Sequence, residues 1–368
     1  MNNFKATARP RKRTAIDPFR MAAAFLIVAI HTAPLSSFNE TADFLFSYCF
    51  ARIAVPFFLM TTGYFTLSPI ISKNNRFLNQ KLLISPYKSF WKSMKKTALL
   101  YLAATVLYLP VNIYSSKLPA LKDLFKVLIF DGTFYHLWYL PAVLLGLLLL
   151  FPLSQKCDYR ILMPVCATLY LIGLLGDSWY GLATKLPPVK SFYDSLFAIS
   201  SYTRNGIFYA PVFLLMGAAT SGKPIRRRFD TVMINLTGTL FFLLLMLGEG
   251  FLSYHLKWQR HNSMYLFLVP CMYFLFRLLL VLPGKSSHML RTVTMLIYLL
   301  HPFMIILIRG FAKLTRLSAY LVENSLIHYL AVCIGSFLAA LVLTALAPPI
   351  TTLATTIFTQ KLPHKRHY

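Results

Sequence analysis

Charged side chains are scarce in this sequence. Only 13% of its 368 residues are Asp, Glu, Lys or Arg, whereas 57% are hydrophobic. Soluble domains carry about 25% charged residues, so the composition excludes an ordinary soluble domain. Apolar runs approach the ~20 residues that a helix needs to cross a bilayer, and they recur along the whole chain. The sequence therefore predicts an all-α integral membrane protein.

Acidic residues are the rarest of the charged ones. The chain has 11 Asp and Glu against 37 Lys and Arg, which gives a net charge of +26. Strongly basic chains often bind polyanions. Here, however, the basic residues form short blocks between apolar runs, as the positive-inside bias of membrane proteins predicts. We therefore expect the lipid bilayer as a partner and no nucleic acid.

Several chemical motifs are missing. No cysteine pair has the spacing of zinc ligands, so neither a metal site nor a disulfide framework is expected. The chain also lacks a Gly-rich phosphate loop, a G-x-S-x-G elbow and a C-x-x-C pair. The chemistry that remains is histidine as a general base, arginine as an anion holder and a carboxylate that orients them. The five scattered cysteines are Cys49, Cys157, Cys166, Cys271 and Cys333.

Ten apolar segments have the length and composition of transmembrane helices. With the N-terminus in the cytoplasm, the cytoplasmic segments carry 24 Lys and Arg and the outer segments carry 10. This bias predicts about ten helices with both termini cytoplasmic. The expected organisation is a basic cytoplasmic tail (1–15), one transmembrane domain (16–346) and an apolar, then basic, cytoplasmic C-terminal segment (347–368) that does not cross again. The ten segments lie near 16–34, 43–68, 94–113, 136–153, 159–176, 206–220, 231–252, 263–282, 290–309 and 327–346.

The first apolar segment contains the stretch FRMAAAFLIVAIH, in which Arg20 and His31 bracket ten residues without another polar side chain. Eleven residues make about three helical turns, so both side chains share one face, roughly 16 Å apart along the axis. Taken singly, Arg20 is explained equally well by anchoring at the cytoplasmic interface, and His31 by the outer interface. Together they favour a shared internal cavity, because a charge facing lipid is costly.

Other polar candidates gather in the predicted outer half. Most of them have the ordinary explanation that the interface lies there. Glu249 and His301 differ because they lie inside apolar helices, where an ionisable residue is a functional candidate. Arg52 is the most deeply placed charge of the second segment, and we expect His31 or Glu249 to pair with it. The candidates for substrate binding are Arg52, His136, Trp138, Asp177, Arg204, Glu249 and His301.

The second segment also carries Pro56 and the run Thr61-Thr62-Gly63. The proline predicts a kink, and the small residues predict close approach of a neighbouring helix.

Four stretches resemble signatures of the acyltransferase-3 family of membrane proteins. DPFRMAAAFLIVAIH resembles its first helix, and VPFFLMTTGYF resembles its next segment, with Thr62 where serine is usual. HLWYLPAVL and IYLLHP resemble later signatures. Three more stretches, TRNGIFYAPVFLLMG, GDSWYGL and HNSMYLFL, are similar to the N-terminal membrane domain of membrane-bound serine racemases of vancomycin-resistance operons. The similarity runs from about residue 14 to residue 345.

The family resemblance implies a multi-pass protein of the bacterial plasma membrane. It implies transfer of an acyl group from cytoplasmic acyl-CoA to an acceptor at the outer face, with His31 as the catalytic base and Arg20 holding the donor or shaping the site. The racemase resemblance implies a domain that delivers L-serine to a fused or partner racemase for D-serine synthesis in cell-wall glycopeptide resistance. A pyridoxal-phosphate racemase domain would then follow Tyr368, and the segment itself would bind no pyridoxal phosphate.

Three functions thus remain open. For acyl transfer, the basic loop 73–96 would meet CoA phosphates, although it offers lysines and Arg76 where the family usually has an Arg-rich motif. For serine handling, Arg204 or Arg52 would hold the carboxylate, and Glu249 or Asp177 the ammonium group. The third is a membrane anchor or oligomerisation platform, and a homodimer is open in each case.

Overall fold

Helices make up most of the chain that the structure describes. The computed structural model describes residues 14–71, 84–220 and 229–359, with the backbone alone for 84–86, 229–230 and 347–359. No β-strand occurs in these ranges. The long helices are α1 (Ile16–Thr32), α3 (Ala54–Thr66), α5 (Ile84–Tyr114), α7 (Tyr139–Lys156), α8 (Tyr159–Leu175), α10 (Pro187–Ile199), α11 (Ala210–Ala219), α12 (Phe229–His255), α13 (Leu268–Val281), α14 (His288–Leu314) and α15 (Ser325–Thr359). Short turns are α2 (Glu40–Asp43), α4 (Ser68–Ile71), α6 (Leu124–Lys126) and α9 (Tyr180–Ala183).

A helix lies in each of the ten ranges that the sequence predicts. Six helical stretches in the described part of the chain are long and apolar enough to cross a membrane, judged by length and composition. Three further helices, α8, α11 and α13, are apolar but shorter. The all-helical membrane class is therefore confirmed. The six stretches are Glu40–Thr66, Tyr87–Tyr114, Tyr139–Lys156, Thr231–His255, His288–Leu314 and Ser325–Leu346.

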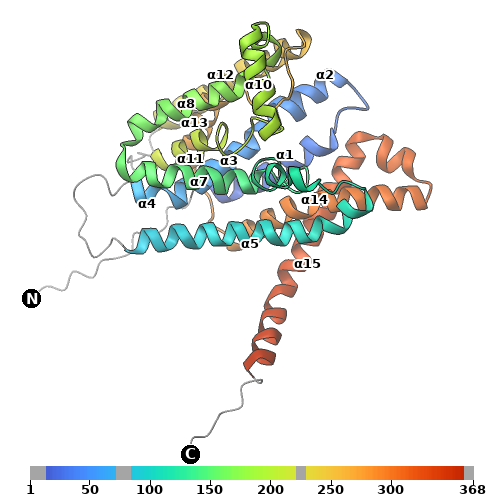
Figure 1. Cartoon of the computed structure of the whole chain (residues 1–368). Coiled ribbons are helices and arrows are strands. Elements are labelled where there is room, and N and C mark those ends of the chain that lie inside the picture. The colour runs from blue at the N-terminus through green and yellow to red at the C-terminus, as the bar shows by residue number, and fades with distance from the viewer. Residues whose placement is uncertain (1–13, 72–83, 221–228, 360–368) are drawn as a thin grey trace, which may run out of the picture.

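The helices form a buried centre and an apolar outer ring. Residues 210–218 of α11 are all buried, and α3, α7 and α8 pack around this helix. By contrast, α5, α12 and α15 expose large aliphatic side chains such as Leu102, Leu244 and Ile334. Figure 1 shows α5 running along one side of the molecule, beside α7 and α14. Exposed apolar rows of this length fit a lipid environment, where backbone polar groups are satisfied inside each helix.

The helix is irregular in the turn that precedes Pro56. The stretch before α3 is irregular, with a π-helical turn at Phe44–Cys49 and a 3-10 turn at Phe50–Ile53. Proline lacks an N–H and its ring clashes with the carbonyl of residue i−4, which here is Arg52. The irregular stretch therefore includes Arg52, whose side chain is buried.

Two glycines bring α3 and α11 into backbone contact. A Cβ at Gly63 would collide with the carbonyl group of Leu214, and a Cβ at Gly217 would collide with that of Met60. Only glycine permits such an approach, as in small-residue contacts between membrane helices. The expected role of the Thr61-Thr62-Gly63 run in close packing is thus confirmed at Gly63.

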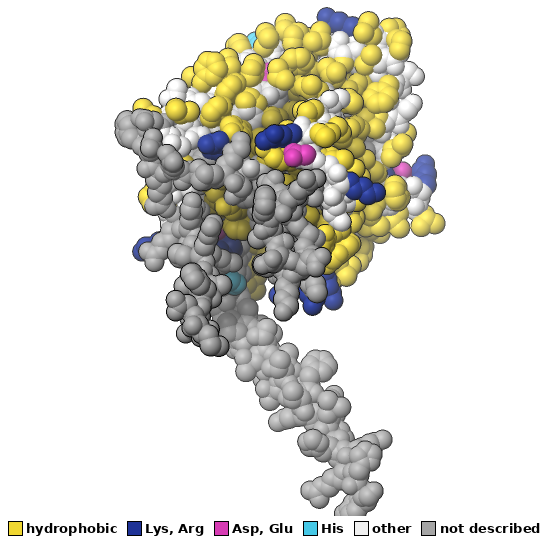
Figure 2. Space-filling model, turned by 90° about the vertical axis from the view of Figure 1, so that its left-hand side faces the viewer, with side chains coloured by type: hydrophobic (Ala, Val, Ile, Leu, Met, Phe, Trp, Pro, Cys, Tyr) yellow, Lys and Arg dark blue, Asp and Glu magenta, His cyan; other side chains and the backbone are white. Residues whose placement is uncertain are grey.

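Apolar side chains also dominate the end of the molecule seen in Figure 2, with Lys and Arg scattered among them. Many of the predicted basic residues lie outside the described residues, namely in 1–13 of the N-terminal tail, 73–83 of the basic loop and 360–368 of the C-terminal segment. The remainder of that loop begins α5, and the predicted C-terminal segment continues α15 as far as Thr359.

Candidate functional site

One cavity of about 280 Å³ extends along α1. It lies between α1, α3, α5, α7 and α14, together with the loop that precedes α11. Arg20 and His31 both line it, as do four of the other candidate residues. The cavity therefore reaches from the first turn of α1 to its last. Its polar lining residues are Arg20, His31, Arg52, Thr62, Lys96, His136, Trp138, Tyr139, Arg204, Arg291, Thr294 and Tyr298.

The buried carboxylate of Asp17 organises the Arg20 end. Its Oδ1 accepts a hydrogen bond from Arg20 Nε at 3.1 Å, and its Oδ2 accepts one from Arg291 at 2.7 Å. Ser286 Oγ and the backbone N–H of Ser287 also donate to Oδ2. Asp17 thus joins the start of α1 to the start of α14 and holds two guanidinium groups at this end of the cavity. Lys96 of α5 adds a third positive charge.

Three histidines meet at the other end. The ring of His31 stacks on that of His301 with centroids 5.3 Å apart, and His136 meets His301 edge-on, also at 5.3 Å. His301 Nδ1 lies 2.9 Å from the carbonyl oxygen of Tyr298, so we assign the proton to Nδ1 and leave Nε2 as an acceptor. His301 Nε2 and both ring nitrogens of His136 have no hydrogen-bond partner among the described residues. This end therefore offers unprotonated imidazole nitrogens.

The three rings do not form a metal centre. In the parts of the chain that the structure describes, no group of three or more His, Cys, Asp or Glu side chains is placed to hold a metal ion.

Two arginines flank the histidine end. The side chain of Arg52 is 6% exposed, and its guanidinium carbon lies 5.4 Å from the ring centroid of Tyr48. The guanidinium of Arg204 lies over the rings of Trp138 and Tyr202, at 5.0 Å and 4.5 Å. Among the described residues, no carboxylate lies within ion-pair distance of either arginine. Burial, together with the positive charge of Arg52, lowers the pKa of Arg204 to about 10.

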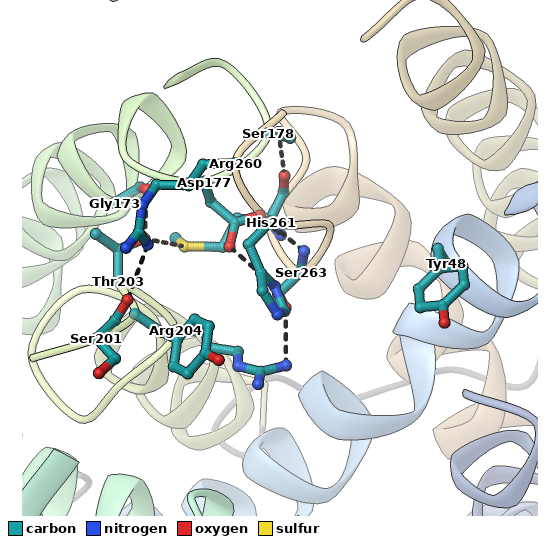
Figure 3. A network of polar contacts seen from close by, with 12 residues as sticks. Tyr48, Gly173, Asp177, Ser178, Ser201, Thr203, Arg204, Arg260, His261 and Ser263 are labelled. Carbon is teal, nitrogen blue, oxygen red and sulfur yellow. Dashed lines mark hydrogen bonds and ion pairs between the residues drawn. The ribbon is translucent and has the colours of Figure 1, made fainter. Parts of the chain in front are cut away.

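Asp177 and His261 belong to a polar network behind Arg204. Asp177 Oδ1 accepts hydrogen bonds from the backbone N–H groups of Ser263 and Met264 at 2.7 and 3.0 Å. Ser263 Oγ lies 2.9 Å from His261 Nδ1 and accepts a hydrogen bond from Arg204 at 3.3 Å. Figure 3 shows Arg204 directed toward this serine.

The charges of that network favour a neutral histidine. Burial raises the pKa of Asp177 against the effect of its backbone donors. His261 Nδ1 lies 3.7 Å from Asp177 Oδ2, a distance that suits an ion pair only if the ring is protonated. Burial and the positive charges of Arg204, Arg52 and Arg260 hold the pKa of His261 well below its ordinary value. We therefore treat His261 as neutral, and the contact is not an ion pair.

Glu249 does not pair with Arg52, so that expectation is wrong. Its Oε1 accepts hydrogen bonds from Trp179 Nε1 at 2.9 Å and from the backbone N–H of Leu266 at 2.8 Å, while Oε2 accepts one from Phe267 at 3.1 Å. Leu266 and Phe267 belong to the turn before α13 and Trp179 to the loop after α8, and together they hold the carboxylate outside the cavity lining. His31 does not pair with Arg52 either, since no hydrogen bond joins these two described residues.

The structure thus sorts the candidate residues into two groups. The cavity lining includes Arg20, His31, Arg52, His136, Trp138 and Arg204. His301 packs behind His31, whereas Asp177 and Glu249 are held by backbone amides outside the lining. Asp17 and Arg291 were not among the candidates. The spacing of Asp17 and Arg20, three residues apart in the first helical turn, was a signal for the former.

Comparisons with known proteins give one family model and several relatives named as racemases. The acyltransferase domain family matches residues 13–345. An amino-acid racemase of Enterococcus faecalis is 40% identical over 338 residues, which cover 90% of this chain and 45% of the relative. A second amino-acid racemase of Enterococcus faecalis is 34% identical, with 96% and 48% covered.

A serine/alanine racemase of Enterococcus gallinarum is 35% identical, with 88% of this chain and 45% of the relative covered. The chain therefore spans about half the length of the curated relatives it matches. No solved structure matches it.

Proposed function

The chain belongs to the acyltransferase-3 family of membrane proteins, and on that premise we propose that it transfers an acyl group from cytoplasmic acyl-CoA to an acceptor at the outer face of the bacterial plasma membrane. The observation that carries the proposal is the cavity that Arg20 and His31 both line. A single cavity with a basic end and a histidine end suits a donor that arrives at one end and an acceptor that arrives at the other.

The basic end suits the anionic donor. Arg20, Arg291 and Lys96 bring three positive charges to the lining, and Asp17 balances one of them. Guanidinium groups bind phosphate through paired hydrogen bonds. In this proposal Arg20 orients the donor so that its thioester points along α1 toward His31.

His31 is the general base in the proposed reaction. It takes the proton from the acceptor's hydroxyl or amino group as the acceptor attacks the thioester carbon. The new C–O or C–N bond forms, the C–S bond breaks, and the thiolate of CoA leaves and takes a proton from the imidazolium. The stacked ring of His301 keeps His31 in place during both transfers.

The test uses protein purified in detergent and acyl-CoA with a labelled acyl group. We expect saturable binding of acyl-CoA, weakened by Arg20→Gln, and an acceptor-dependent release of CoA thiol that His31→Ala abolishes while binding persists. Arg277→Gln is the control, because Arg277 contacts the Tyr273 hydroxyl outside the cavity. Purified protein that binds no acyl-CoA would refute the proposal.

A second candidate is the membrane domain of a serine racemase system that takes up or delivers L-serine. The names of the racemases that share 34–40% identity with the chain favour it. A pyridoxal-phosphate racemase, as a further domain or a partner, would then make D-serine for glycopeptide resistance. Uptake of labelled L-serine into proteoliposomes tests this function, and flux equal to that of empty vesicles would exclude it.

Both candidates need a defined orientation in the membrane. We propose that the ten predicted segments all cross the bilayer, the shorter helices included, and that both termini are cytoplasmic. The basic residues of the predicted cytoplasmic segments support this orientation. Reporter fusions placed after residues 35 and 114 should then report the outer side, and a fusion at the C-terminus the cytoplasm.

A further inference from the structure

Two positive charges line the cavity, the buried Arg52 and the partly buried Arg204, and no carboxylate of the described residues lies within ion-pair distance of either. Arg52 is 94% buried, and its Nε has no hydrogen-bond partner among the described residues; the same holds for Arg204 Nε. The described ion pairs join Asp17 to Arg20 and Arg291 and bring His261 near Asp177, so none involves Arg52 or Arg204. An unpaired buried charge costs several kcal/mol. A protein retains such charges where they have a function.

The surroundings hold both guanidinium groups in place. Arg204 lies over Trp138 and Tyr202 and donates to Ser263 Oγ, which His261 also contacts. Arg52 lies at the break before α3 and faces Tyr48. These contacts fix the positions of the two guanidinium groups and use only one of their N–H donors, Nη1 of Arg204. Nε has no hydrogen-bond partner among the described residues on either arginine.

The two arginines share the cavity with His31. All three residues line it, and the positive charge of Arg52 is close enough to lower the pKa of Arg204. We propose that Arg52 and Arg204 form one subsite for the carboxylate of the small substrate that reaches His31. The inference rests on the proposed function, in which that substrate is the acyl acceptor, and it makes the acceptor a small hydroxy- or amino-acid anion.

The chemistry of the subsite favours a carboxylate. Guanidinium forks match the planar carboxylate through paired hydrogen bonds, and a carboxylate between the two arginines gives both of them a negative partner and halves the uncompensated charge. Asp177 and Glu249 accept hydrogen bonds from backbone amides outside the cavity, and no Asp or Glu of the described residues lines it. Recognition therefore depends on the carboxylate of the ligand and not on an ammonium group.

Thermal unfolding of the purified protein with four probes tests the subsite. We expect L-serine and glycolate to raise the midpoint temperature, because both carry a carboxylate and a hydroxyl, while ethanolamine does not. Arg52→Gln and Arg204→Gln should each weaken apparent affinity for both ligands by at least about tenfold, since each removes a charge-assisted hydrogen bond. Arg277→Gln should leave the rise in midpoint temperature with L-serine and with glycolate unchanged. Stabilisation by ethanolamine, or by inorganic phosphate alone, would overturn the assignment.

The unliganded variants separate binding from a structural role. Removing an unpaired buried charge should leave Arg52→Gln at least as stable as the parent without ligand, whereas a structural arginine would lower the midpoint. If Arg52→Gln is destabilised without ligand and its midpoint temperature still rises with L-serine and glycolate as in the parent, the subsite is refuted. Binding of acyl-CoA, measured in parallel, distinguishes the two proposals. Carboxylate binding without acyl-CoA binding refutes acyl transfer alone, and the reverse refutes the subsite alone.

Discussion

Replacing Asp17 by asparagine tests how the first helix is held in the bundle. The carboxylate accepts four hydrogen bonds, one at Oδ1 from Arg20 and three at Oδ2 from Ser286, Ser287 and Arg291. Asparagine keeps one oxygen and places an NH₂ group at the other position. With the oxygen at the Oδ2 position, three bonds survive in a weaker, neutral form, and the NH₂ group faces the N–H of Arg20, where two donors oppose each other.

The size of the effect follows from the burial of these groups. Breaking a buried ion pair by removing one partner costs about 3–5 kcal/mol. The Arg291 side chain is 32% exposed, so solvent compensates part of its loss. We therefore expect Asp17→Asn to destabilise the protein by about 2–4 kcal/mol and to weaken acyl-CoA binding, because Arg20 loses its fixed orientation.

Thermal or denaturant unfolding in detergent measures the loss. Asp158→Asn is the matched control: its carboxylate is exposed and caps α8 through the N–H of Arg160, and asparagine caps a helix equally well. We expect less than about 0.5 kcal/mol for this control. If Asp17→Asn has the same free energy of unfolding as the Asp158→Asn control, the idea that the carboxylate joins α1 to α14 is refuted.

Three other perturbations have expected outcomes. In an unfolding assay, Gly63→Ala should destabilise the protein by about 1–3 kcal/mol or more, because the new methyl group collides with α11. Gly310 has open space around it, so Gly310→Ala should be neutral or stabilising in the same assay. Glu249→Gln should lower the unfolding midpoint, because its NH₂ group would oppose a backbone N–H. Because the pKa of His261 is depressed in the folded protein, the unfolded chain binds a proton at His261 below a pH of about 6.5 and the folded protein does not. The contribution of His261 to the free energy of unfolding should therefore be constant above that pH and fall below it. His261→Gln should reduce this slope in unfolding measured as a function of pH.

Periodicity was sufficient to predict the main axis of the site. Arg20 and His31 are eleven residues apart, and a regular helix places such residues on one face. Because α1 is regular from Ile16 to Thr32, both side chains reach the same cavity. The ten helical ranges followed from apolar runs for the same reason, since local composition decides where helices form in this chain.

Contacts between distant segments could not be predicted in this way. Asp17 and Arg291 lie on helices whose pairing depends on the whole bundle, so no local pattern announces their ion pair. The prediction that Glu249 pairs with Arg52 was wrong for a different reason. A buried acid seemed available in Glu249, but its oxygens accept hydrogen bonds from Trp179 and from two backbone amides in the turn before α13. Sequence identifies which charges are buried, and only geometry shows which are already satisfied.

The ion pair between Asp17 and Arg20 also affects how the chain enters the membrane. Its two members are three residues apart on α1, so they can pair as soon as this helix forms, long before α14 is synthesised. A paired charge is cheaper to carry toward a bilayer than a free one. The first helix can therefore insert with Arg20 already neutralised, and Arg291 joins the same carboxylate when the ninth predicted segment arrives. The site is complete only after His301 has been translated, so a nascent chain that stops earlier displays the Arg20–His31 signature without a cavity that could use it.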